Sequence, residues 1–99
     1  MARLTDEAVA AGLQELAKLK RGEMPSDADL DGAPILAGWF VEDISNGYQR
    51  LGGFVTGHPT IRPGWCWTSV LLFISDDRTW ARTISRYYRL GSPLTIDPS

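Results

Sequence analysis

The chain has 99 residues, of which 43% are hydrophobic and 22% charged, and its formal net charge at pH 7 is −2. These values are typical of one small globular domain, and they argue against a disordered chain or a protein that coats nucleic acid non-specifically. The sequence shows no long apolar run that predicts a membrane helix and no secretory signal, and its single cysteine fits a reducing compartment, so we expect a cytoplasmic protein.

Residues 5–21 carry strong signals for a helix. Thr5 suits the N-cap position, and acidic residues follow it in the first turn. Val9 and Leu13 belong to an apolar stripe at helical spacing, basic residues lie near the end, and Gly22 suits the position after the last turn. We therefore predict an N-terminal helix over residues 5–21.

Residues 22–34 form a polar and acidic connector that contains two prolines and two glycines. Within it, residues 27–32 (DADLDG) resemble the start of a calcium-binding loop. The twelfth position of such a loop requires a bidentate carboxylate, and here it is Gly38. We interpret residues 22–34 as a solvated acidic linker, and we predict no metal site and no cofactor.

Most of residues 35–91 has the composition of β-structure, and residues 92–99 read as a tail. Gly52-Gly53 indicates a bulge or bend in the second of the candidate strands. The candidates are residues 35–44 (a strand or a short helix), 48–58, 65–75 and 79–90, with a turn at 76–78. The predicted fold is one α+β domain spanning residues 1–99, with the N-terminal helix packed on a three- to four-stranded antiparallel sheet.

Residues 79–90 (TWARTISRYYRL) fit a third strand, although their spacing also fits a helix. We prefer the strand because Thr, Ile, Tyr and Trp favour strands over helices. On one strand, a single face would present alternating apolar and basic side chains: Trp80, Arg82, Ile84, Arg86 and Tyr88.

The arginines of this segment allow three interpretations. Residues 1–47 carry nine acidic and four basic residues, whereas residues 48–99 carry three acids and six arginines. The arginines could pair with acids of the first half such as Glu15 or Asp43, contact a partner protein, or bind single-stranded nucleic acid while aromatic rings stack on bases.

Trp65 and Trp67 point to the same side of their strand if that strand is regular. One helix covers only one face of a small sheet, so the uncovered face could present an aromatic patch. Such patches are typical of protein interfaces, and they suggest binding to a partner protein or to a second copy of this chain.

His58 is the only histidine. It could act as a general base beside Cys66 or Ser69 on the next strand. The alternative is a loop-anchoring side chain whose ring nitrogens hydrogen-bond the backbone or nearby hydroxyls. Cys66 stands between two tryptophans, which indicates a buried and inert thiol.

The combination of GHP (57–59), WTS (67–69) and ARTISRYYRLG (81–91) is similar to a family of small uncharacterised bacterial proteins. The resemblance covers residues 51–91 and implies a recurring order GHP, TS, ART-x-SR-x-Y-x-LG. It implies a single β-containing module without a known activity. The residues it marks are Gly57, His58, Pro59, Thr68, Ser69, Arg82, Thr83, Ser85, Arg86 and Tyr88.

The leading functional hypothesis is a small non-enzymatic protein-binding module, by analogy with the regulators and inhibitors carried on phages and mobile elements. The alternative is a nucleic-acid-binding module that uses residues on the strand 79–90. The third is a hydrolase or transferase built on His58. The candidate interaction residues are Trp65, Trp67, Trp80, Arg82, Arg86, Tyr88 and His58.

Overall fold

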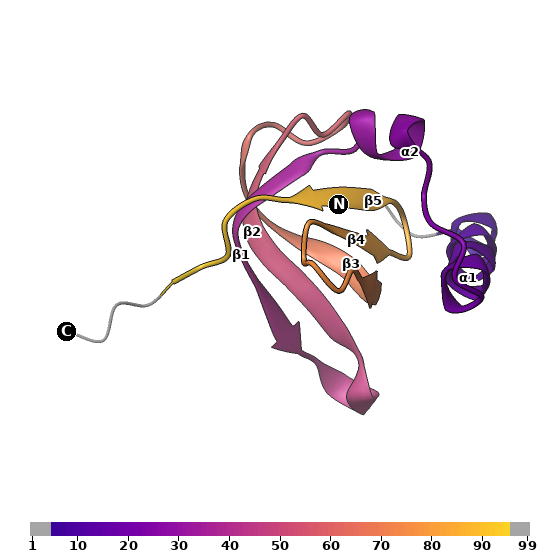
Figure 1. Cartoon of the computed structure of the whole chain (residues 1–99). Helices are drawn as coiled ribbons and strands as arrows, with labels where there is room; N and C mark the ends of the chain where they lie inside the picture. The colour runs from indigo at the N-terminus through magenta and orange to yellow at the C-terminus, as the bar shows by residue number, and fades with distance from the viewer. Residues whose placement is uncertain (1–4, 96–99) are drawn as a thin grey trace.

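The computed structural model describes residues 5–95, in which five strands close into a β-barrel (Figure 1). Each strand pairs with the next in antiparallel fashion, and the last strand closes the barrel by pairing in parallel with the first. The elements in chain order are α1 (Asp6–Lys20), α2 (Asp27–Asp31), β1 (Ile35–Asp43), the 3₁₀ turn η1 (Ser45–Gly47), β2 (Gln49–Thr56), β3 (Gly64–Ile74), β4 (Trp80–Thr83) and β5 (Tyr87–Leu90).

The predicted open α+β sheet is wrong, because the strands form a closed barrel. Two differences produce the closure. Residues 35–43 form a full strand, and residues 79–90 form two strands instead of one. β5 then reaches β1, where Ile35 pairs with Arg89 and Leu36 pairs with Leu90. Closure gives each of the five strands two neighbours along at least part of its length.

The split of residues 79–90 occurs at a tight turn over Ile84 and Ser85. The Thr83 N–H donates to the Arg86 carbonyl at 2.9 Å, which closes the turn, and β4 and β5 pair on either side of it. Partners in an antiparallel pair share one face of the sheet. The turn therefore reverses the chain and ends the single alternating face that the sequence predicted.

The side chains of β4 and β5 divide between two cores. Trp80 and Tyr87 point outward and pack beneath the helices, whereas Ala81 and Tyr88 point into the barrel. The interior core consists of Leu36, Trp39, Leu51, Val55, Ala81, Tyr88 and Leu90. The outer core consists of Leu19, Ala33, Trp80 and Tyr87. The predicted row of Trp80, Arg82, Ile84, Arg86 and Tyr88 is thus not one surface.

α1 lies on one side of the barrel, apart from the strands β1 and β2 (Figure 1). Thr5 is its N-cap and accepts a hydrogen bond from the Ala8 N–H at 3.0 Å, in agreement with the signal in the sequence. Gly12 lies directly against the β4–β5 turn: a Cβ atom on Gly12 would come within 2.5 Å of the Ile84 carbonyl oxygen. The glycine thus lets the helix approach the turn closely.

The acidic connector contains the short helix α2. Ser26 and Asp29 form a capping box, in which each side chain accepts a hydrogen bond from the other residue's N–H. Residues 27–32, which resemble the start of a calcium loop, therefore form the helix α2 and its C-terminal cap. Within residues 5–95, no three His, Cys, Asp or Glu side chains form a cluster that could hold a metal ion.

Candidate functional site

Three aromatic rings pack against one another on the outer surface of β1 and β3. The rings of Phe40 and Trp65 are stacked with centroids 5.6 Å apart. Trp67 meets Phe40 edge-on at 5.5 Å and Trp65 edge-on at 5.9 Å. Phe54 of β2 pairs with Trp65 in the strand register and adds a fourth ring. We call Phe40, Phe54, Trp65 and Trp67 the aromatic patch.

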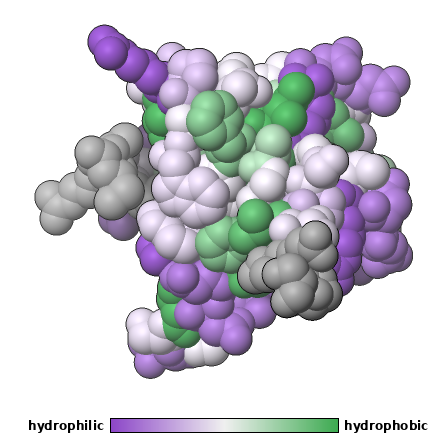
Figure 2. All heavy atoms as spheres, turned by 90° about the vertical axis from the view of Figure 1, so that its left-hand side faces the viewer, coloured by the Kyte–Doolittle hydropathy of each residue, from purple (hydrophilic) through white to green (hydrophobic). Residues whose placement is uncertain are grey.

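The aromatic patch is exposed although its rings are large and apolar. Trp65 is 54% exposed, Phe54 is 49% exposed and Trp67 is 37% exposed. Figure 2 views the molecule from the side opposite α1 and shows pale and green side chains gathered at the centre of this face, with hydrophilic ones around them. In the described part of the chain, the main contacts of the two helices are with β3, β4 and β5, and the rings of Trp65, Phe54 and Trp67 stay open to solvent.

The alternation of β3 places the patch outside. Trp65 and Trp67 point outward, whereas Cys66 between them packs against the interior core. Gly52 of β2 lies beneath the rings, since a Cβ atom there would come within 2.7 Å of the Trp67 ring and 3.0 Å of the Phe40 ring. The absence of a side chain at Gly52 therefore lets two rings lie flat on the barrel.

One cation lies at the edge of the patch. The Arg50 guanidinium carbon is 3.9 Å from the centroid of the Trp67 ring. The same guanidinium donates to Glu42, with N–O distances of 2.7 and 2.9 Å. Because Glu42 neutralises Arg50, the patch is aromatic without a net positive charge at this edge.

Of the sequence-predicted site residues, the structure brings Trp65 and Trp67 together and buries others. Trp80 is 5% exposed, Arg82 is 9% exposed and Tyr88 is 3% exposed. A stacking platform for bases needs exposed rings. Residues 80–88 therefore do not provide the surface that the nucleic-acid hypothesis required.

His58 anchors a loop. Its Nδ1 accepts hydrogen bonds from the N–H groups of Thr60 at 3.1 Å and Ile61 at 3.2 Å. Burial lowers the pKa of His58, and the positive charge of Arg86 lowers it further. The ring is thus held in the neutral form, with Nδ1 as an acceptor.

The groups proposed to react with His58 are engaged elsewhere. Ser69 Oγ lies 3.0 Å from Ser85 Oγ, and burial raises the pKa of the Cys66 thiol. Within residues 5–95, His58 makes no hydrogen bond to Cys66 or Ser69. A nucleophilic thiol needs a lowered pKa and an adjacent base. The described geometry shows neither.

Sequence reasoning missed Phe40, Phe54 and Arg50. Phe40 belongs to residues 35–44, whose sequence fits a strand or a short helix, so its face does not follow from the sequence. Phe54 and Arg50 belong to a predicted strand whose register does not follow from the sequence. Their membership of this surface follows from pairing: Phe54 pairs with Trp65, and Glu42 pairs with Arg50.

A model of a family of unknown function, DUF6634, matches residues 8–97. The chain belongs to this family. The match agrees with the resemblance to a family without a known activity, whereas the recurrence of the motifs in DUF6634 and a bacterial origin stay predictions. Neither curated proteins nor solved structures give a match. In the part of the chain that the structure describes, no helix has the length and apolarity needed to cross a membrane.

Proposed function

We propose that this DUF6634 protein is a non-enzymatic protein-binding module and that its docking surface is the aromatic patch. The observation that carries the proposal is the packing of Phe40, Trp65 and Trp67 around one another while Trp65 stays 54% exposed. Clustered tryptophan rings are enriched at the energetic centres of protein interfaces. The contacts among Phe40, Trp65 and Trp67 hold these rings in place before a partner binds, and this lowers the entropic cost of binding.

The charge of the patch favours a protein over a nucleic acid. Nucleic acids are bound through cations that neutralise phosphates, and the affinity depends on how many are free. Among residues 5–95, Arg50 is the cation whose guanidinium lies over a ring of the patch, and Glu42 already pairs with it at 2.7 Å. The chain as a whole is acidic, with a net charge of −2.

The mode of binding is side-chain docking. Every strand of the barrel pairs with two neighbours along part of its length, and the patch consists of outward-facing side chains, so we infer docking through side chains. A fully exposed aromatic side chain offers about 150–250 Å² of surface. The exposed parts of Phe54, Trp65 and Trp67 therefore add up to about 300 Å². A standard interface buries about 800 Å² on each side, so the patch would form the centre of a small interface. We infer a partner that presents an apolar segment, and the module would act as its regulator or inhibitor.

The test is affinity capture with matched variants. Trp65→Ser combined with Trp67→Ser removes the patch, whereas Leu13→Ser removes an exposed apolar side chain from α1, where Leu13 is 52% exposed. We expect wild type and Leu13→Ser to retain the same partner from a lysate of the native host and the double variant to lose it. Recovery of the same proteins by all three would contradict the proposal.

A second copy of the chain is the other protein that the patch could bind. Sedimentation velocity of the same three proteins distinguishes this case. A dimer in wild type and in Leu13→Ser, with a monomer in the double variant, would assign the patch to self-association. Monomers throughout, together with partner capture that depends on the patch, would assign it to a different protein.

A further inference from the structure

Two arginines of the β4–β5 hairpin have no carboxylate partner among residues 5–95. The three ion pairs of this part of the chain involve Lys18, Arg21 and Arg50, so the predicted pairing of hairpin arginines with Glu15 or Asp43 does not form. The Nε atoms of Arg82 and Arg86 are buried and have no hydrogen-bond partner. A buried charged donor without a partner is costly, so both side chains need an explanation.

Arg82 is held under Tyr87 without being neutralised by a direct contact. Its guanidinium carbon is 4.9 Å from the Tyr87 ring centroid, and one terminal nitrogen donates to the Ile84 carbonyl at 3.3 Å. The nearby acid Glu15 is occupied, because it accepts from the Tyr87 hydroxyl at 2.8 Å and pairs with Lys18 at 3.2 Å. The positive charge of Arg82 therefore has no direct anionic contact among residues 5–95.

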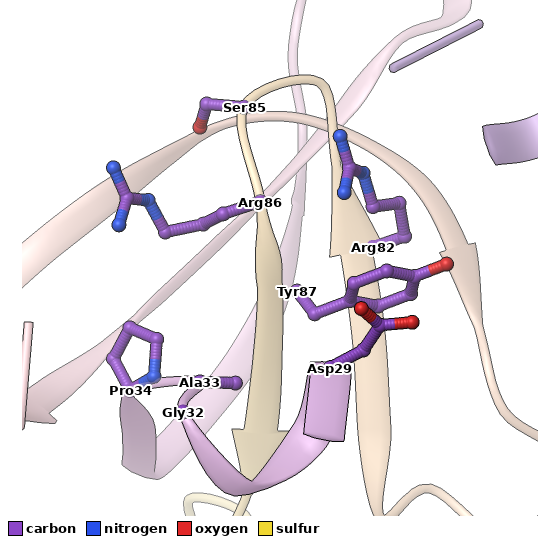
Figure 3. Close-up of a pocket in the computed structure, with 8 residues that line it drawn as sticks. All are labelled: Asp29, Gly32, Ala33, Pro34, Arg82, Ser85, Arg86 and Tyr87. Carbon is purple, nitrogen blue, oxygen red and sulfur yellow. The ribbon is translucent and has the colours of Figure 1, made fainter. Parts of the chain in front are cut away.

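The Arg86 side chain makes fewer contacts than the Arg82 side chain, which touches the Tyr87 ring and the Ile84 carbonyl. Its backbone is fixed, because its N–H donates to Thr83 Oγ1 at 3.4 Å and its carbonyl accepts from the same hydroxyl at 3.2 Å. Its guanidinium donates no hydrogen bond to any residue from 5 to 95. Figure 3 shows the Arg86 guanidinium and the Ser85 hydroxyl on the same side of β5, with Arg82 on the other side beside Tyr87.

These side chains line an open hollow of about 230 Å³. Arg86 and Ser85 lie at one end in Figure 3, and Pro34, Ala33 and Asp29 lie toward the other. The complete lining is Asp29, Gly32, Ala33, Pro34, Arg82, Ser85, Arg86 and Tyr87. One end of the hollow thus offers a guanidinium fork and the Ser85 hydroxyl, and the acid lies apart from them. The Ser85 hydroxyl lies 3.0 Å from Ser69 Oγ and 3.4 Å from Thr83 Oγ1, so it is free to donate to a ligand when it accepts from these two hydroxyls.

We propose that this hollow binds a phosphate group, with the Arg86 guanidinium and the Ser85 hydroxyl as its direct donors and with Arg82 adding positive charge from the other side of β5. A guanidinium offers paired N–H donors that match the oxygens of a phosphate, and a hydroxyl adds a further donor. Asp29 at the opposite end would repel a second anionic group and would favour a cationic or donor group on the body of a phosphate ester.

The site is separate from the aromatic patch, which lies on the outer face of β1, β2 and β3. The two proposals therefore fail independently. The Trp65→Ser and Trp67→Ser double variant should keep phosphate binding, and loss of phosphate binding should leave the patch intact.

The experiment is a titration of the ¹⁵N-labelled full chain with inorganic phosphate at constant ionic strength, followed through the arginine Nε–H signals and the backbone amides. We expect saturable shifts of the Arg86 Nε–H and the Ser85 amide. Arg86→Gln should weaken binding by about tenfold or more, because a charge-assisted donor is lost. The matched control is Arg78→Gln, which removes the same charge from the exposed turn between β3 and β4 and should bind as wild type does.

Further variants and ligands complete the design. Ser85→Ala should also weaken binding, and it keeps the test valid if Arg86→Gln fails to fold. O-phosphoserine serves as the ester: tighter binding than inorganic phosphate, lost in Asp29→Asn, assigns the site to a phosphate ester, and equal binding assigns it to the free anion. Linear shifts without saturation, equal effects of Arg78→Gln and Arg86→Gln, or equal competition by acetate would overturn the proposal.

Discussion

The Trp67 ring lies on the backbone of Gly52, so close that a Cβ atom at residue 52 would come within 2.7 Å of the ring. The two residues are paired across β2 and β3. Because Gly52 has no Cβ atom, the rings of Trp67 and Phe40 can pack close to the barrel backbone. The geometry of the aromatic patch depends on a residue that the patch itself covers.

Gly52→Ala should tilt the Trp67 ring away from the barrel. The atoms in the way are ends of side chains, so the rings have room to move outward, and we expect a loss of about 1 kcal/mol in the free energy of unfolding. Urea unfolding and the indole N–H shifts of Trp67 measure the two effects. Gly32→Ala is the control, because its nearest atom is 3.9 Å away and its stability should change little. An unshifted Trp67 signal in Gly52→Ala would contradict the close packing.

Gly12→Ala tests the docking of α1. Alanine favours a helix over glycine by up to about 1 kcal/mol, so an exposed site would gain stability. Here the Cβ atom would meet the Ile84 carbonyl oxygen at 2.5 Å, and backbone atoms do not yield as side chains do. We expect a net loss of about 1–2 kcal/mol, measured by urea unfolding. A more stable variant would show that α1 is not held against the β4–β5 turn.

The parts of the fold that could be predicted from the sequence depend on local signals. Thr5, the acidic first turn and Gly22 mark the ends of α1, and the apolar run of residues 65–75 marks β3. The closure of the barrel depends on β5 pairing with β1, two strands that are far apart in the chain. Composition and periodicity carry no information on such a pairing.

The turn between β4 and β5 was missed for a physical reason. Ile84 and Ser85 lack the glycine, asparagine or proline that marks most tight turns. The turn forms because tertiary contacts fix it: the Ile84 N–H donates to the Val70 carbonyl at 3.0 Å, and Gly12 of α1 covers the Ile84 backbone. The aromatic patch could be predicted only in part. That Trp65 and Trp67 share one face follows from the alternation of side chains along a strand. The contribution of Phe40 follows only from the sheet register.

Tyr87→Phe should lower stability in a pH-dependent way. The Tyr87 hydroxyl donates to Glu15 at 2.8 Å, and this hydrogen bond is the main cause that holds the pKa of Glu15 below its ordinary value of 4.5. A carboxyl whose pKa is lower in the folded state stabilises the fold above its unfolded pKa, and the effect is lost as the pH falls through the folded pKa. We expect a loss of about 1 kcal/mol at pH 7, which shrinks below pH 4.5.

Urea unfolding from pH 7 to pH 3 measures this difference between wild type and Tyr87→Phe. Tyr48→Phe is the matched control, because Tyr48 is 57% exposed and its hydroxyl has no hydrogen-bond partner among residues 5–95, so its stability should not change. Glu15→Gln should flatten the same part of the pH profile. A constant difference between wild type and Tyr87→Phe across the whole range would rule out the link to the ionisation of Glu15.

Cys66 should react slowly with thiol reagents in the folded protein. Its side chain packs against the interior core, burial raises the pKa of its thiol above 9.0, and only the thiolate is nucleophilic. We expect alkylation by iodoacetamide at pH 7.5 to be at least about tenfold slower than in the protein unfolded by urea. A fast reaction that stays constant between pH 6 and pH 8 would instead reveal a thiolate at neutral pH, and it would revive the hypothesis of an enzyme built on His58 and Cys66.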